Sequence, residues 1–134
     1  MQCSIKASSF SKKEASVQAK QSKIGFGITP ESADSLPNPA ELFLSSFSAC
    51  ILKNVERFSV LMKFEYSHAE ITVNAIRLEK PPRMDEINYD LKVYSNDESL
   101  NIDLLKRNIE KFGTIYNTVK AVCTITSEIK KVEE

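Results

Sequence analysis

The chain lacks the features that mark several large functional classes. It has one histidine, His68, and three widely spaced cysteines, so neither a zinc site of cysteine and histidine ligands nor a complete disulfide framework is expected. Basic and acidic residues number 18 each, and the absence of a basic excess argues against binding to nucleic acid or anionic membrane. No run reaches the roughly 18 apolar residues of a membrane span, and the N-terminus has no apolar secretory segment. We therefore expect a cytoplasmic protein with reduced thiols, without a metal, cofactor or membrane partner.

The length of 134 residues predicts a single domain, residues 1–134, that is large enough to form a core without a structural metal or disulfides. Three short segments open the chain with loose apolar alternation, at 2–10, 15–19 and 23–28. They predict a meander of antiparallel strands, although the second segment, EASVQAK, is also compatible with a helix by propensity. The proline- and serine-rich segment 29–39 is expected to be a loop.

The strongest helix start signal is a capping box formed by Asn38 and Glu41, with Pro39 at the first helical position. We expect the helix to extend from Pro39 to about Lys63. No charge occurs in residues 42–52, which predicts that this half of the helix is enclosed on all sides, and the pattern then becomes amphipathic.

The C-terminal part alternates between strand and helix patterns. Segments 67–80 and 87–95 alternate apolar and polar residues, with a phase slip at Ala75. They are expected to pair as antiparallel strands on either side of a break at residues 81–86.

A second helix is predicted to open at residues 96–99 and to end at Gly113 as a C′ glycine. Thr114 is then expected to cap a short third helix, and segment 121–129 closes the chain as a strand. The order βββ-α-ββ-αα-β predicts an α+β fold of antiparallel strands with segregated helices around a long central helix.

Cys50 is the one candidate nucleophile that the local pattern singles out, because it lies in the charge-free helix. Two interpretations stay open from the local sequence: a buried helix with an inert cysteine, or burial that prepares the thiol for chemistry. A reactive thiolate needs a cation, a donor or a helix N-terminus nearby, and Cys50 lies about three turns past the N-terminus. Any activating group must therefore come from elsewhere in the chain or from another subunit.

Two segments, NPAELFLSSFSAC at residues 38–50 and IEKFGTIYNTVKA at residues 109–121, resemble motifs of the OsmC/Ohr family, the osmotically inducible and organic hydroperoxide resistance proteins. The segment NPAELFLSSFSAC, residues 38–50, is similar to the family motif that carries a reactive cysteine on a central helix. The segment IEKFGTIYNTVKA, residues 109–121, resembles the second motif, in which a turn containing a second cysteine starts a short helix. The resemblance implies an OsmC-like fold and an intertwined homodimer with two sites at the subunit interface.

The resemblance also implies thiol-dependent reduction of organic hydroperoxides, with Cys50 as the attacking cysteine. The family glutamate falls at Ala40, so its neighbour Glu41 becomes the candidate acidic residue of the site. The second cysteine position is occupied by Gly113, and no arginine precedes Arg57 to match the family's N-terminal arginine.

Several lysines are candidates to replace the missing arginine: Lys12, Lys13, Lys20 and Lys23. Cys3 and Cys123 are candidates to resolve an oxidised Cys50, while a buried structural role is the usual one for a cysteine like Cys123. His68, at a strand start, is expected to be a surface histidine rather than a base.

An apolar site is predicted around the thiol, walled by Phe43, Phe47, Tyr116 and Asn117, although the aromatic residues also fit a core. Three functions remain open: a peroxidase regenerated by an external thiol, a non-catalytic protein that binds a small apolar ligand, and a redox sensor.

Overall fold

The computed structural model describes residues 1–134 as two compact units, Met1–Phe43 and Leu44–Glu134. The N-terminal unit contains an antiparallel meander of β1 (Lys6–Ser9), β2 (Ala15–Ala19) and β3 (Ser22–Phe26). The predicted meander is confirmed, and the segment that also fitted a helix is strand β2. Lys12 and Lys20 lie in the two connecting turns with φ of 65° and 54°, a left-handed conformation that tight turns require. One 3₁₀ turn, η1 (Pro30–Ser32), interrupts the following loop.

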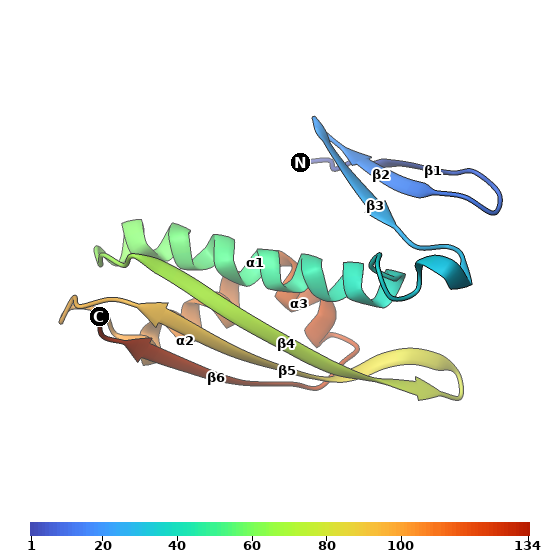
Figure 1. Cartoon of the computed structure of the whole chain (residues 1–134). Helices are drawn as coiled ribbons and strands as arrows, with labels where there is room; N and C mark the ends of the chain where they lie inside the picture. The colour runs from blue at the N-terminus through green and yellow to red at the C-terminus, as the bar shows by residue number, and fades with distance from the viewer. The chain divides into compact units, whose positions relative to one another are not determined.

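The long helix α1 (Pro39–Leu61), shown in Figure 1, begins at the predicted capping box. The backbone N–H of Asn38 donates to Oε1 of Glu41 at 3.0 Å, and the N–H of Glu41 donates to Oδ1 of Asn38 at 2.8 Å. Two backbone donors that the first turn leaves without a helical partner are thereby satisfied. The helix ends two residues before the expected Lys63, whose φ of 58° is incompatible with a continuing helix.

The C-terminal unit is built on a sheet of β4 (His68–Glu79), β5 (Pro82–Tyr94) and β6 (Ile125–Val132), in that order. Strands β4 and β5 pair antiparallel, as expected. Strand β6 differs from the expectation, because it pairs parallel to β5. The reason lies in the connection: two helices carry the chain from the end of β5 back to the end of the sheet where β5 began, as a parallel pair requires.

A β-bulge lies opposite the predicted phase slip at Ala75, but Ile76, which the slip placed on the buried side, is exposed. Asn74 pairs with Asn88 but Ile76 pairs with Asp85, so two residues of β5 face one residue of β4. Glu86, in the bulge, has a φ of 49°. Residues 81–86 were expected to break the strand, but β5 begins at Pro82 because the turn needs no more than two residues.

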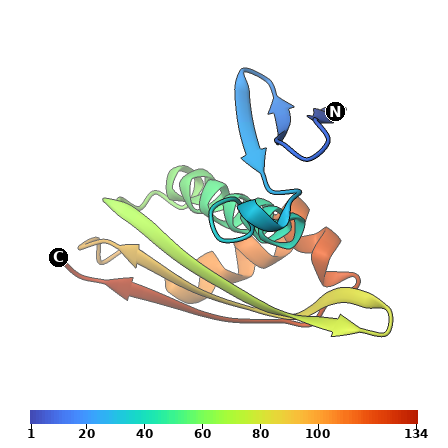
Figure 2. The ribbon, with the colours of Figure 1, turned by 45° about the vertical axis from the view of Figure 1, so that its right-hand side comes forward.

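Helices α2 (Ile102–Phe112) and α3 (Thr114–Lys120) lie on the same face of the sheet as α1 (Figures 1 and 2). Helix α2 begins after Asn101, whose Oδ1 accepts the backbone N–H of Leu104 at 3.0 Å. Residues 96–99, where we expected this helix to open, form a turn around Asp97 instead. Its carboxylate accepts backbone N–H groups from Glu65 and Ser99, both at 2.8 Å, and so joins two loops.

The core of this unit lies between the sheet and the three helices. Alternate residues of β5 point into it and the residues between them point to solvent, as a half-buried strand requires. The buried apolar side chains of the unit are Phe47, Ile51, Val55, Phe58, Phe64, Ile87, Tyr89, Leu91, Val93, Leu100, Leu105, Ile109, Tyr116 and Val119. None of the helices combines the length and the apolar character needed to span a bilayer.

The charge-free half of α1 is less enclosed than its composition predicted. Phe47 and Ile51 are fully buried, but Ser45, Ser46 and Ala49 are exposed in the single chain. Helices α2 and α3 and the sheet cover one side of α1, and the expectation of burial on all sides is therefore wrong for one copy of the chain.

Candidate functional site

Cys50 lies in α1, about three turns from the N-terminus of the helix, and is half-buried. Its sulfur faces the junction between α2 and α3. A β-carbon added to Gly113 at this junction would lie 3.4 Å from Sγ of Cys50, an ordinary contact distance. The structure therefore brings together the two positions that the family motifs singled out, 63 positions apart in the sequence.

Gly113 ends α2 and precedes α3, but it is not the left-handed C′ glycine that we expected. Its φ of −71° and ψ of 116° are extended, which any residue can adopt. A side chain is excluded instead by close approach, since its β-carbon would lie 2.9 Å from both the carbonyl oxygen of Ile109 and Cβ of Tyr116. Gly113 is also the N-cap residue of α3, so the expected capping role of Thr114 is wrong and Thr114 is the first helical residue.

Asn54 is the polar side chain that contacts the thiol. Its Nδ2 donates to the backbone carbonyl of Cys50 at 2.8 Å and lies 3.7 Å from Sγ of the same residue. Residues four apart on a helix lie on one face, and helical side chains tilt toward the N-terminus, so Asn54 reaches back one turn to Cys50. Asn54 was not among the site residues predicted from the sequence, although its i+4 spacing from Cys50 was a usable signal.

Aromatic rings pack beside the thiol and the glycine. The ring of Phe47 contacts Tyr89 at 5.8 Å and Tyr116 at 6.0 Å between centroids, and Phe47 has no exposed surface. Burial, followed by the negative charge of Glu110, raises the pKa of Tyr116 to about 12, so its phenol is neutral at neutral pH. The predicted site residues Phe47 and Tyr116 thus lie next to Cys50 and Gly113 as parts of the core.

The sequence and the fold are those of a known family. A family model described as OsmC-like protein matches residues 32–128. The chain belongs to the OsmC family. No curated protein matches the sequence, whereas several solved structures share its fold.

An OsmC-like protein from Mycoplasma pneumoniae superimposes with a TM-score of 0.87 at 17% identity, over 98% of each chain. An organic hydroperoxide resistance protein from Legionella pneumophila gives 0.67 at 13% identity, over 95% of this chain and 96% of its own. The organic hydroperoxide resistance protein OhrB of Bacillus subtilis gives 0.60 at 15% identity, over 95% and 98%. At these identities the similarity establishes the OsmC-like fold.

The remaining predicted site residues of this OsmC protein have structural partners. Glu41 is held by the capping box of α1, in the N-terminal unit, where Phe43 is half-buried in the same helix. Asn117 of α3 donates its side-chain N–H to the carbonyl of Lys111 at 3.0 Å and its backbone N–H to that of Gly113 at 2.9 Å. Asn117 therefore holds the α2–α3 junction, and the roles of Glu41, Phe43 and Asn117 in a site stay predictions.

Cys123 and the first arginine of the OsmC protein make contacts of their own. Cys123 donates its S–H to the carbonyl of Met84 at 3.3 Å, and burial raises its pKa, which favours the unreactive thiol. Cys3 is exposed, and all three cysteines are free. Arg57 lies over the rings of Phe58 and Phe112, at 5.3 and 5.9 Å from their centroids.

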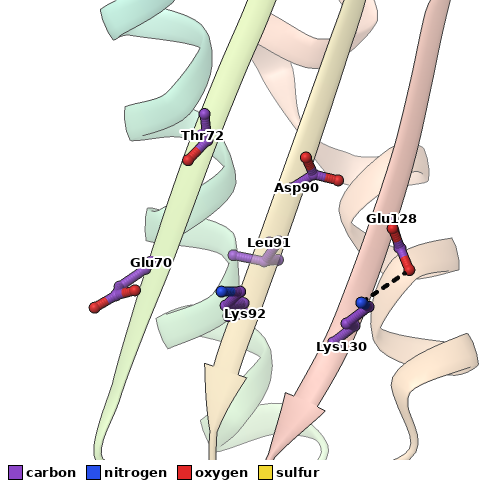
Figure 3. A pocket seen from close by; sticks show the side chains of 7 residues that line it. All are labelled: Glu70, Thr72, Asp90, Leu91, Lys92, Glu128 and Lys130. Atoms are coloured by element: carbon purple, nitrogen blue, oxygen red, sulfur yellow. Dashed lines mark ion pairs between the residues drawn. The ribbon is translucent and has the colours of Figure 1, made fainter.

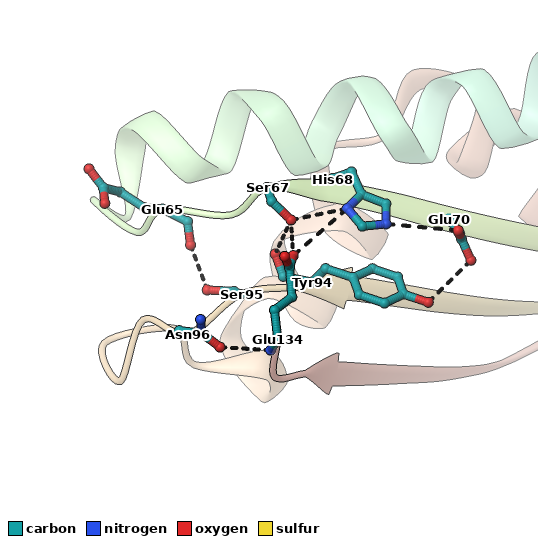
Figure 4. Close-up of polar contacts among 8 residues, drawn as sticks. All are labelled: Glu65, Ser67, His68, Glu70, Tyr94, Ser95, Asn96 and Glu134. Atoms are coloured by element: carbon teal, nitrogen blue, oxygen red, sulfur yellow. Dashed lines mark hydrogen bonds and ion pairs between the residues drawn. The ribbon is translucent and has the colours of Figure 1, made fainter.

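His68 lies on the surface, as predicted (Figure 4). Its ring stacks on Tyr94 with centroids 4.0 Å apart, Nδ1 is 3.0 Å from Oγ of Ser67, and Nε2 is 3.8 Å from Glu70. Oγ of Ser67 also donates to Glu134, a carboxylate that competes with the histidine for the hydroxyl proton. The group ties the C-terminus of the described chain to the start of β4.

A groove of about 300 Å³ crosses the outer face of the C-terminal sheet (Figure 3). Its lining side chains come from all three strands: Glu70, Thr72, Asp90, Leu91, Lys92, Glu128 and Lys130. Acidic and basic residues are mixed, and Lys130 pairs with Glu128 at 3.3 Å. This mixture is typical of a solvated sheet face and selects no ligand of one charge.

Proposed function

We propose that the protein is a thiol-dependent peroxidase that reduces organic hydroperoxides through Cys50. One observation carries the proposal: the cysteine of the OsmC motif is half-buried rather than sealed, with a hydrogen-bond donor on one side and a glycine on the other. Members of the same fold are named organic hydroperoxide resistance proteins, which agrees with this chemistry.

In the proposed reaction the Cys50 thiolate attacks the distal oxygen of the hydroperoxide. The O–O bond breaks, the sulfur loses two electrons and becomes sulfenic acid, and the alkoxide leaves as an alcohol after taking a proton. An external thiol then condenses with the sulfenic acid, releasing water and forming a mixed disulfide. A second external thiol reduces that disulfide and regenerates Cys50.

The external reductant follows from Gly113. The family position for a resolving cysteine lies against Cys50, and here it carries no thiol. The proposal therefore uses no cofactor, and it places the protein in the cytoplasm, where small thiols are abundant. Phe43, Phe47, Tyr116 and Asn117 are proposed to hold the apolar part of the peroxide. Glu41 is proposed as the acidic residue of the site.

The proposal includes a homodimer, as the family resemblance implies. Two exposed surfaces support a homodimer, because a second copy of the chain would bury them. One is formed by the apolar side chains Ile5, Phe10 and Ile24 of the N-terminal unit, and the other is the charge-free side of α1. Size-exclusion chromatography with light scattering is expected to give twice the mass of one chain. A monomer would exclude a site formed at the interface between two subunits.

The test is a turnover assay with tert-butyl hydroperoxide and dithiothreitol. The wild-type protein and a Cys123→Ser control are expected to consume peroxide, whereas Cys50→Ser is expected to be inactive. Mass spectrometry should show a sulfenic acid adduct at Cys50 when the reductant is withheld. Absence of both turnover and oxidation at Cys50 would refute the peroxidase.

The alternative is a small-molecule-binding or redox-sensing protein on the same scaffold. It is favoured by the Gly113 substitution at the resolving position and by the engagement of Glu41 in the helix cap. Oxidation of Cys50 without turnover would indicate a sensor. An unreactive Cys50, with ligand binding unchanged in Cys50→Ser, would indicate a binding protein.

A further inference from the structure

Asn54 is a polar side chain in a position where the fold calls for an apolar one. It is 8% exposed and follows the buried Ile51 by one turn, beside the buried Val55. Asparagine is a weak helix former, and burying an amide costs free energy unless its polar atoms are hydrogen-bonded. The structural reason for an amide here must therefore lie in the groups that it contacts.

The side-chain nitrogen of Asn54 makes two polar contacts with Cys50, one with the carbonyl oxygen at 2.8 Å and one with the sulfur at 3.7 Å. A backbone carbonyl only accepts, so the hydrogen bond to it fixes the nitrogen end of the amide toward Cys50. The same NH₂ group carries a second N–H. The distance to Sγ is within the range of an N–H···S hydrogen bond, so the sulfur faces a donor.

A hydrogen-bond donor at this position stabilises the negatively charged form of the sulfur. Hydrogen bonds to the ionised form of a group favour that form, and the thiolate is the nucleophilic form of cysteine. The amide is neutral, so its effect is smaller than that of a cation. It needs no counter-charge, and it also holds the cysteine side chain in one orientation.

We propose that Asn54 is the positioning residue of Cys50, which donates to its thiolate and orients it toward an incoming electrophile. The inference deepens the proposed function and rests on it for the nature of that electrophile. In this proposal a neutral amide on the same helix stabilises the thiolate. That task belongs to the N-terminal arginine of the family, which this sequence lacks.

The competing explanation is a purely structural one. Asparagine side chains in helices also bond the carbonyl of residue i−4 without any effect on chemistry. In that case substitution of Asn54 changes the stability of α1 and leaves the reactivity of Cys50 as it was. The two explanations differ in one measurable quantity, the pH profile of the thiol reaction.

The experiment measures the rate at which iodoacetamide alkylates Cys50 between pH 5 and 10, read from the mass of the Cys50 peptide. We expect Asn54→Leu to slow the reaction at pH 7 by about three- to tenfold and to move the profile to higher pH by about half to one unit. Asn54→Asp is expected to slow it further, because a carboxylate repels the thiolate. The matched control is Asn108→Leu, since Asn108 also donates its amide to a sulfur, Sδ of Met62 at 3.4 Å. It should react within twofold of wild type.

A folded Asn54→Leu variant with the wild-type profile would overturn the assignment. A second measurement needs no variant: in the ¹H–¹⁵N spectrum of the wild-type protein, a side-chain N–H of Asn54 should shift at the pH where Cys50 alkylation turns on. Side-chain signals of Asn54 that do not move over this range would also overturn it.

The peroxidase assay keeps the two proposals apart. Turnover by the wild type together with an unaltered Asn54→Leu profile refutes the role of Asn54 and leaves the peroxidase. A shifted Asn54→Leu profile in a protein with neither turnover nor oxidation at Cys50 refutes the peroxidase and supports the role of Asn54 in the chemistry of the thiol.

Discussion

Gly113 provides a direct test of the geometry of the site, because a side chain at this position must lie against Cys50. A β-carbon there would approach the carbonyl oxygen of Ile109 and Cβ of Tyr116 to 2.9 Å, closer than van der Waals contact allows. It would also lie 3.4 Å from Sγ of Cys50. In a disulfide the β-carbon of one cysteine lies about 3.0 Å from the sulfur of the other, so only a small shift separates this geometry from a bond.

The variant Gly113→Cys should therefore lower the stability of the protein when it is reduced and raise it when it is oxidised. In the reduced state, the two short contacts are expected to cost about 1–3 kcal/mol, the usual range for overpacking. In the oxidised state, a bond to Cys50 closes a loop of about 64 residues, for which the chain-entropy relation gives about 4 kcal/mol of stabilisation. The oxidised variant is thus expected to be about 1–3 kcal/mol more stable than wild type, and the reduced variant to be less stable by a similar amount.

The measurement is urea unfolding with and without reductant, together with a thiol count. Substitution of Cys3 and Cys123 by serine leaves one pair, so that a disulfide removes two thiols per chain. Gly113→Ala is the matched control, because it adds the same β-carbon without a thiol and should be destabilised under both conditions. A stable Gly113→Ala would contradict the short contacts with Ile109 and Tyr116. Failure of Gly113→Cys to form an intramolecular disulfide with a mild oxidant would show that the junction does not lie against Cys50.

Three further predictions concern the cap, the core and the acid response. Asn38→Ala should lower the free energy of unfolding by about 1 kcal/mol in urea denaturation, because the first turn loses its capping acceptor, and no loss would contradict the capping box. Phe47→Ala should cost about 3–5 kcal/mol by the same assay, since the ring is fully buried, and a cost near zero would mean that the ring is not part of the core. Hydrogen bonds, first from Ser99, hold the pKa of Asp97 below its usual 3.8, so its contribution to stability is complete above that pH and is lost as the pH falls through the lower folded value. Asp97→Asn should flatten the acid dependence of urea unfolding in this window, whereas the exposed control Asp34→Asn should not, and equal slopes in both variants would rule out the role of Asp97.

The elements that could be predicted from the sequence are those decided by neighbours in the chain. The hydrogen bonds of the capping box join Asn38 to Glu41, three residues apart, and depend on nothing else. The strands β4 and β5 were visible as alternating segments, because the side-chain period of a strand is two, but the extra residue of the bulge lies on β5 and was not visible. At the capping box the local chemistry permits one outcome.

The wrong expectations concern choices made by the rest of the fold. The apolar alternation of the last strand is the same whether it pairs parallel or antiparallel, so the pattern could not reveal that β6 runs parallel to β5. The end of α2 at Gly113 was visible, but the glycine meets a steric demand from Ile109 and Tyr116 rather than a demand of its own φ. Both residues are near in the sequence, but their close approach depends on how tightly the chain turns where α2 ends and α3 begins, which the residue pattern did not show.

The candidate site shows the same division. Cys50 was identifiable through its motif. Asn54 was identifiable in principle through helical spacing, since side chains four residues apart on a helix are neighbours. The contact of Cys50 with Gly113 depends on how α2 and α3 pack on α1, which no local pattern encodes. The comparison of motifs supplied it indirectly, by aligning Gly113 with a second cysteine.

The loss of that second cysteine has a consequence for any chemistry at Cys50. A thiol at position 113 would be close enough to trap an oxidised Cys50 within the same chain, whereas the glycine at this position offers no thiol. In the proposed reaction the oxidised Cys50 then waits for a thiol from solution, and its lifetime depends on the concentration of that thiol. The rate of reduction by external thiol therefore separates the two functions: the proposed peroxidase requires fast reduction of the oxidised Cys50, whereas a sensor would keep the oxidised state for longer.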